Sequence, residues 1–157
     1  MRRLFFAGFA ALLLAASAAP AAAADTAKKA QTCLAAAEMQ GGNKQLCVGL
    51  IAAACLKTAK DEQTPEAACA ARELAFWQAE LDRNWKALQP LLAGFPEAKG
   101  PQLAAQKTWL DYRDKSCAVA DKVDPGMMPG GTARCRMEET AARAIALNQL
   151  VDALSEH

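Results

Sequence analysis

The sequence lacks the residues on which several common kinds of site depend. Its single histidine is His157 at the C-terminus, which leaves no histidine for a Ser–His or Cys–His catalytic arrangement. It contains no C-x2-C pair of the kind that binds zinc or carries thioredoxin-type redox chemistry. It also lacks a nucleophile elbow and a phosphate-binding glycine loop. We therefore predict that the protein is not an enzyme and uses neither a metal nor a cofactor.

Strand signals and excess charge are also missing. β-Branched and aromatic residues do not alternate with polar ones, and helix-forming Ala, Leu, Gln, Glu and Lys dominate. The chain has 18 basic and 17 acidic residues, so it lacks the positive field that nucleic acid or anionic lipid requires. We predict an all-α protein that does not bind nucleic acid.

The first 24 residues have the layout of a secretory signal. Two arginines precede the apolar stretch Leu4–Ala16, which is short for a membrane span, and three alanines at 22–24 suit a signal peptidase. We predict that residues 1–24 are cleaved and that Asp25 becomes the N-terminus; the alternative is an uncleaved membrane anchor. No lipidation cysteine follows the cleavage site, so the sequence does not predict a lipoprotein. We expect no stable membrane span after cleavage. Removal of the two arginines leaves a mature net charge near −1.

Glycine- and proline-rich turns divide the mature chain into helical segments. The predicted helices cover residues 25–39, 44–58, 64 to about 90, 101–122 and 132–155. Short connections favour antiparallel neighbours, so the fold class is all-α, a small antiparallel helical bundle. We predict that it forms a single domain over residues 25–157.

The third helix carries the clearest apolar pattern. Glu73 and Glu80 fall largely away from its apolar face, and Glu80 is expected in solvent. The apolar face consists of Leu74, Trp77, Leu81, Trp85, Leu88 and Leu92. In the fourth helix we predict a face of Leu103, Leu110 and Cys117, and in the last helix one of Leu147, Leu150, Val151 and Leu154.

Six cysteines lie downstream of the predicted leader. An even number in a short exported chain indicates disulfides and a periplasmic or secreted bacterial protein. Six cysteines allow 15 pairings, so the spacing expresses only a geometric preference. Cysteines that flank one helical turn can meet within about 4.4–6.8 Å between Cα atoms. The preferred pairs are Cys33–Cys47, Cys55–Cys69 and Cys117–Cys135.

Four motifs follow one another in the C-terminal two-thirds. Cys69, Glu73, Trp77 and Leu81 are spaced by four. Next come Gln106, Trp109, Tyr112, Arg113, Asp114 and Cys117, then Gly130, Gly131 and Thr132, and finally Cys135, Thr140, Arg143 and Leu147. Together they resemble the lysozyme inhibitor LprI-like family over about residues 55–154. The resemblance implies an exported protein that inhibits lysozyme by protein–protein binding.

The second motif has two physical interpretations. Gln106, Trp109 and Arg113 share a helical face, since they are three and four residues apart. We favour a structural role in which Arg113 pairs with a carboxylate such as Glu73. The alternative is a contact surface formed by Arg113 and Asp114.

The loop between Cys117 and Cys135 is the predicted partner-binding segment. Asp121 and Asp124 suit a basic partner such as lysozyme, and Met127 and Met128 offer adaptable apolar contact. The same loop can equally be a simple solvent-exposed connector. An alternative function is a periplasmic structural or interaction module that binds another envelope protein and has no lysozyme role, which the near-neutral mature charge favours.

Overall fold

The fold consists of α-helices and short 3₁₀ turns. The computed structural model describes residues 21–59, 65–123 and 127–156, and residues 21–23 by backbone only. The elements are α1 (Ala21–Met39), η1 (Lys44–Cys47), α2 (Leu50–Leu56), α3 (Pro65–Leu91), η2 (Leu92–Gly94), α4 (Pro96–Cys117), η3 (Ala120–Lys122) and α5 (Gly131–Ser155). No strand occurs in these ranges, so the predicted all-α class is confirmed. None of the described helices is both long and apolar enough to cross a membrane.

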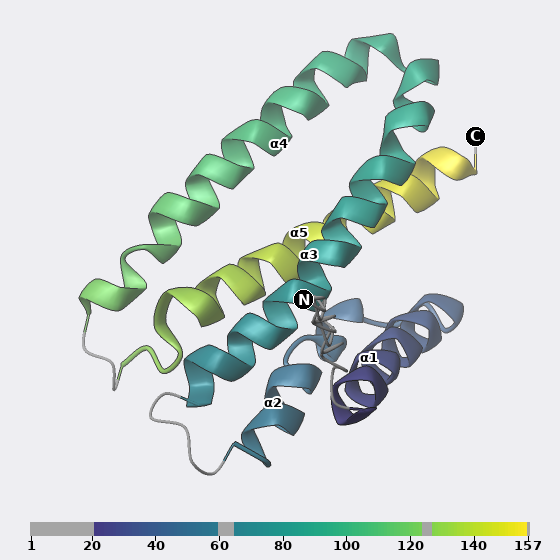
Figure 1. Ribbon diagram of the computed structural model, residues 1–157. Coiled ribbons are helices and arrows are strands. Elements are labelled where there is room, and N and C mark those ends of the chain that lie inside the picture. Colours follow the sequence, from purple (N-terminus) through teal and green to yellow (C-terminus); the bar gives the residue numbers. More distant parts are fainter. Residues whose placement is uncertain (1–20, 60–64, 124–126, 157) are drawn as a thin grey trace, which may run out of the picture.

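The core lies where α3 and α5 pack against each other. The two helices run in the same direction, and α4 runs back between them in sequence (Figure 1). Trp77, Leu81, Leu88 and Leu92 are buried, as their spacing predicted. Opposite them α5 contributes small residues, including Ala141 and Ala144, which let the large α3 side chains approach closely. The Asn84 side-chain amide donates to the Ala144 carbonyl at 2.9 Å and crosses this contact.

The buried face of α5 begins earlier than predicted. Leu147 is buried, but Leu150, Val151 and Leu154 are only partly so. The deeper positions belong to the N-terminal half of the helix, at Met137, Thr140, Ala141, Ala144 and Ile145. Alanine and threonine carry a weak hydrophobic signal, so the pattern of large residues identified only the C-terminal part of the buried face.

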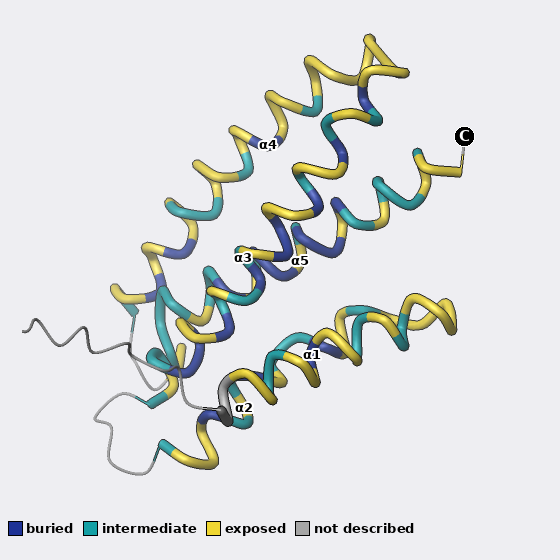
Figure 2. The backbone as a smooth tube through the Cα atoms, turned by 45° about the vertical axis from the view of Figure 1, so that its right-hand side comes forward, coloured by how far each residue is buried: buried dark blue, intermediate teal, exposed yellow. Residues whose placement is uncertain are grey.

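Helix α4 is much more exposed than its neighbours (Figure 2). It begins at Pro96 rather than at Pro101, which lies inside the helix. Of the predicted apolar face only Cys117 is buried, and Leu103 and Leu110 are 43% and 38% exposed. That prediction was wrong for the two leucines, because α4 meets the core through Gln106 and Arg113 instead.

The predicted second helix is split at Val48 and Gly49. Gly49 adopts a left-handed φ of 93°, and η1 and α2 lie on either side of it. The Glu73 side chain of α3 holds the backbone at this break. Its carboxylate accepts hydrogen bonds from the backbone N–H of Gly49 (2.6 Å) and Ala52 (2.8 Å) and from the Trp77 indole N–H (2.9 Å). It thereby caps the first turn of α2 from another helix.

Glu73 and Glu80 are both buried, so the predicted solvent exposure of Glu80 was wrong. Each carboxylate has partners: Glu73 accepts hydrogen bonds from three N–H donors, and Glu80 forms an ion pair with Arg83. Charged groups enter a core when such partners are available. The helical pattern of the sequence could not show the partners of Glu73, because they are mainly backbone groups of a distant segment.

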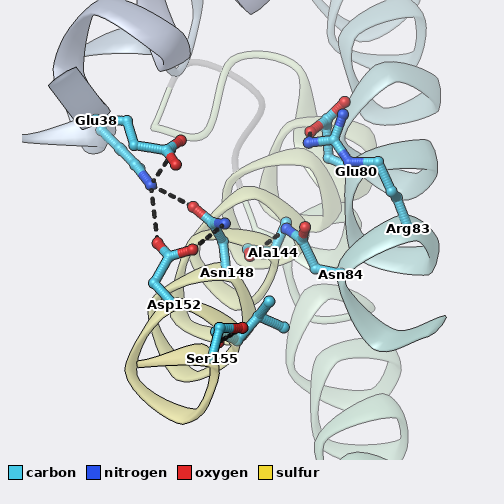
Figure 3. A network of polar contacts seen from close by, with 10 residues as sticks. Glu38, Glu80, Arg83, Asn84, Ala144, Asn148, Asp152 and Ser155 are labelled. Carbon is cyan, nitrogen blue, oxygen red and sulfur yellow. Dashed lines mark hydrogen bonds and ion pairs between the residues drawn. The ribbon is translucent and has the colours of Figure 1, made fainter. Parts of the chain in front are cut away.

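Polar contacts attach the N-terminal segment to α5. The Lys44 ammonium is largely buried and binds the Asn148 side-chain oxygen. It also forms ion pairs with Asp152 of α5 at 3.5 Å and with Glu38 of α1 at 3.4 Å. Figure 3 shows Glu38, Asn148 and Asp152 converging on one point from these two helices. One cation therefore links α1, η1 and α5.

We expect Glu73→Gln to destabilise the protein by about 1–3 kcal/mol, because the amide group would turn N–H donors toward backbone N–H donors in a buried site. Urea unfolding with the disulfides intact measures the change. Glu66→Gln, at an exposed position of the same helix, is the control. Equal stability of the two variants would contradict the capping role.

Candidate functional site

Three disulfides join neighbouring elements. Cys33–Cys47 links α1 to η1, Cys55–Cys69 links α2 to α3, and Cys117–Cys135 links α4 to α5. The Cα–Cα distances are 5.8, 5.5 and 5.4 Å. These are the three pairs that the hairpin geometry favoured. The last disulfide closes the base of the loop that was predicted to bind a partner.

The second motif forms a cluster around Trp109. The Arg113 guanidinium lies 5.1 Å from the centre of the Trp109 ring, and the Arg143 guanidinium lies 5.9 Å from it. Both distances are within cation–π range. Trp109 itself is half-buried, so the indole ring joins α4 to α5 at the margin of the core.

Arg113 connects three helices. Its Nη1 donates to Thr140 Oγ1 of α5 at 3.3 Å and to Gln78 Oε1 of α3 at 3.4 Å. Its Nη2 pairs with Asp114 at 3.0 Å, and Arg136 lies 3.3 Å from the same carboxylate oxygen. The predicted pairing of Arg113 with Glu73 was wrong. Gln78 follows Glu73 by five residues and lies on a different face of α3, toward α4.

Arg143 is held less completely. Its Nε donates to Gln106 Oε1 at 2.9 Å, whereas its Nη2 is buried without a hydrogen-bond partner in the described protein. Burial lowers the pKa of Arg143 from its ordinary value, although an arginine remains charged at neutral pH. Most contacts of this cluster join helices, whereas the Tyr112 side chain is exposed. The arrangement supports a structural role for the motif.

The Gly130–Gly131 turn is built around Asp121. Both glycines have positive φ, 85° and 49°, and a Cβ at Gly131 would collide with the Asp121 carboxylate. That carboxylate accepts a hydrogen bond from the Thr132 backbone N–H at 2.8 Å and caps α5. Hydrogen bonds from the Thr132 side chain and backbone lower the pKa of Asp121. The Thr132 hydroxyl donates a hydrogen bond to the Cys117 carbonyl at 2.9 Å, which ties the start of α5 to the end of α4.

The predicted partner-binding residues separate into two groups. Asp121 already serves the turn, and Asp124 lies outside the described residues. Met127 and Met128 are 78% and 40% exposed, and they line a shallow hollow with Arg134 and Glu138. The two methionines are therefore available for contact.

A second hollow, which the sequence did not predict, lies between α2, α3 and α5. We call it the end hollow; it has a volume of about 260 Å³ and shares Arg134 and Glu138 with the methionine hollow. Its apolar wall consists of Val48, Ala52, Ala53, Leu56, Ala70 and Met137. Small alanines make this concavity, and alanines in a helical sequence give no sign of it. Within the described ranges, no group of three Cys, His, Asp or Glu side chains is arranged to hold a metal ion.

A match to a known protein family shows to which family this chain belongs. The sequence profile described as "Lysozyme inhibitor LprI" matches residues 55–147. The chain belongs to the LprI family. No curated protein and no solved structure matches the chain.

The LprI match covers the disulfides of α2–α3 and α4–α5, the Trp109 cluster and the glycine turn. It begins at Cys55 and so leaves α1, η1 and the Cys33–Cys47 disulfide outside. Lys44, the cation that attaches this outer segment, was not identified from the sequence. A buried lysine has no distinguishing local pattern, since Asn148 and Asp152, two of its three partners, lie 104 and more residues away on α5.

We expect the stabilising effect of Asp121 to disappear in acid. Because its pKa is lowered in the folded protein, its contribution is present above the ordinary aspartate pKa of about 4 and is lost as the pH falls through the folded value. Asp121→Asn should therefore lower the melting temperature at pH 7, and its deficit relative to the wild type should shrink below about pH 4. Thermal unfolding from pH 7 to pH 2 measures this; a deficit that is constant with pH would contradict the cap.

Proposed function

We propose that the protein is an exported inhibitor of a lysozyme that acts by protein–protein binding. The observation that carries the proposal is the LprI family match over residues 55–147. The match spans α3, α4 and the part of α5 up to Leu147. The expected partner is a strongly basic lysozyme, which works with two carboxylates in a cleft. Inhibition requires only that the protein cover that cleft, and it needs no chemistry of its own.

Three disulfides support action outside the cytoplasm. Such bonds persist in oxidising compartments and are rare in the cytosol. A bacterial periplasmic or secreted location, reached through the predicted leader at residues 1–24, agrees with a partner that attacks the cell wall. The leader itself lies mostly outside the described residues.

The loop after α4 is the proposed inhibitory segment. Its two ends are joined by Cys117–Cys135, and its α5 end is further held by the Asp121 cap. Constraining a binding segment before it meets its partner lowers the entropic cost of binding. The exposed Met127 and Met128 supply flexible apolar contact of the kind found at adaptable interfaces.

A lysozyme turbidity assay tests this function. Disulfide-intact protein, residues 25–157, should slow the clearing of a cell-wall suspension in a dose-dependent way. The double variant Met127→Ser/Met128→Ser should raise the inhibition constant about tenfold or more, because truncated central contacts commonly cost 1–2 kcal/mol.

The control is Met39→Ser, which alters a methionine of α1 that is about as exposed as Met127 and lies outside the family match. It should inhibit like the wild type. If the loop variant also inhibits like the wild type, the loop is not the inhibitory segment. If the wild type does not inhibit, the lysozyme role fails, and capture of another envelope protein would support the interaction-module alternative.

A further inference from the structure

We infer that the end hollow receives a long cationic side chain, arginine or lysine, from the surface of the basic partner. This inference rests on the proposed function and names a specific contact for it. The shape, the lining and the charge of the hollow each point to such a side chain.

The size of the end hollow suits a single long side chain. Its volume is about 260 Å³, below the range of about 300–1,000 Å³ that is usual for small-molecule sites. It is open to solvent at a surface formed by α2, α3 and α5. A single protruding side chain from another protein is an occupant of suitable size.

The lining has an apolar wall and an acidic rim. Val48, Ala52, Ala53 and Met137 present hydrocarbon to the interior, whereas Glu66 and Glu138 stand at the edge. Arginine and lysine have the matching construction, because their methylene stems pack on apolar surface while their charged ends stay near solvent and carboxylates.

The charge around the hollow is negative. Its lining holds two carboxylates and one guanidinium, and that guanidinium, of Arg134, already pairs with Glu138 at 2.9 Å. Glu66 has no ion pair among the described residues. An incoming cation therefore meets the carboxylate of Glu66 at the rim.

The end hollow also adjoins the proposed inhibitory segment. The methionine hollow shares Arg134 and Glu138 with it, so the two form one continuous strip along the first turns of α5. A partner that contacts Met127 and Met128 would bring its neighbouring surface over the end hollow. The strip thus combines apolar contact at one end with an acceptor for positive charge at the other.

Two variants test the end hollow, and each has a matched control. Ala53→Trp fills it from an exposed position of α2, and Ala104→Trp places the same side chain on exposed α4. Glu66→Lys reverses the rim charge, and Glu97→Lys makes the same change; both glutamates lie in the first turn of a long helix. Circular dichroism and thermal unfolding should show that all four variants keep the wild-type fold.

The first measurement does not involve lysozyme. N-acetyl-arginine amide is titrated into the isotopically labelled, disulfide-intact protein, and amide NMR shifts are followed. We expect saturable shifts at Gly49, Ala52 and Ala70, weaker shifts with the neutral isostere N-acetyl-citrulline amide, and their loss in Ala53→Trp and Glu66→Lys. Equal shifts with citrulline, or shifts that persist in both variants, would overturn the inference.

The second measurement is inhibition of lysozyme. Ala53→Trp and Glu66→Lys should each weaken inhibition about tenfold, while the two controls should not. If the wild type inhibits and Ala53→Trp inhibits equally well, the end hollow is not part of the interface, although the proposed function stands. If the wild type does not inhibit, the proposed function fails, and the arginine titration alone decides whether the hollow binds a cation.

Discussion

Trp77 and the leucines that follow it on α3 pack against small residues on α5. The positions of the other elements depend on this contact. Burial of large apolar side chains supplies most of the favourable free energy of folding in a domain of this size. The α3–α5 pair runs in one direction, so a helix must return between them in sequence, and α4 does so on the outside (Figure 1). Disulfides and a few polar groups then attach the remaining helices to this pair.

The polar groups at these attachments act across elements. Glu73 holds the N-terminus of α2, Arg113 connects α4 to α3 and α5, and Lys44 links α1 to α5. Each is buried or largely buried, where removal of one partner leaves the other unsatisfied. Several residues of the LprI signature are explained in this way, as parts that position helices. The surface that we propose for a partner lies beside these residues, along the start of α5.

That surface joins two features of different chemistry. The exposed methionines lie in the loop that the Cys117–Cys135 disulfide closes, and the end hollow has an apolar wall and an acidic rim. A near-neutral protein can still attract a basic partner if its negative charge is concentrated where contact occurs. The proposed lysozyme partner is therefore consistent with a net charge close to zero.

Local patterns in the sequence were sufficient for the helical class, the α3 stripe around Trp77 and Leu81, and a preference for hairpin disulfides such as Cys117–Cys135. These features depend on residues close to one another in the chain, with periodicity and turn chemistry that short segments carry by themselves. The burial of Glu73, the partners of Arg113, the exposure of Leu103 and the end hollow were decided only by the tertiary structure. Each depends on which backbone or side chain arrives from a distant segment, and alanine-rich helices carry little sequence information about how closely, and on which face, their neighbours will pack.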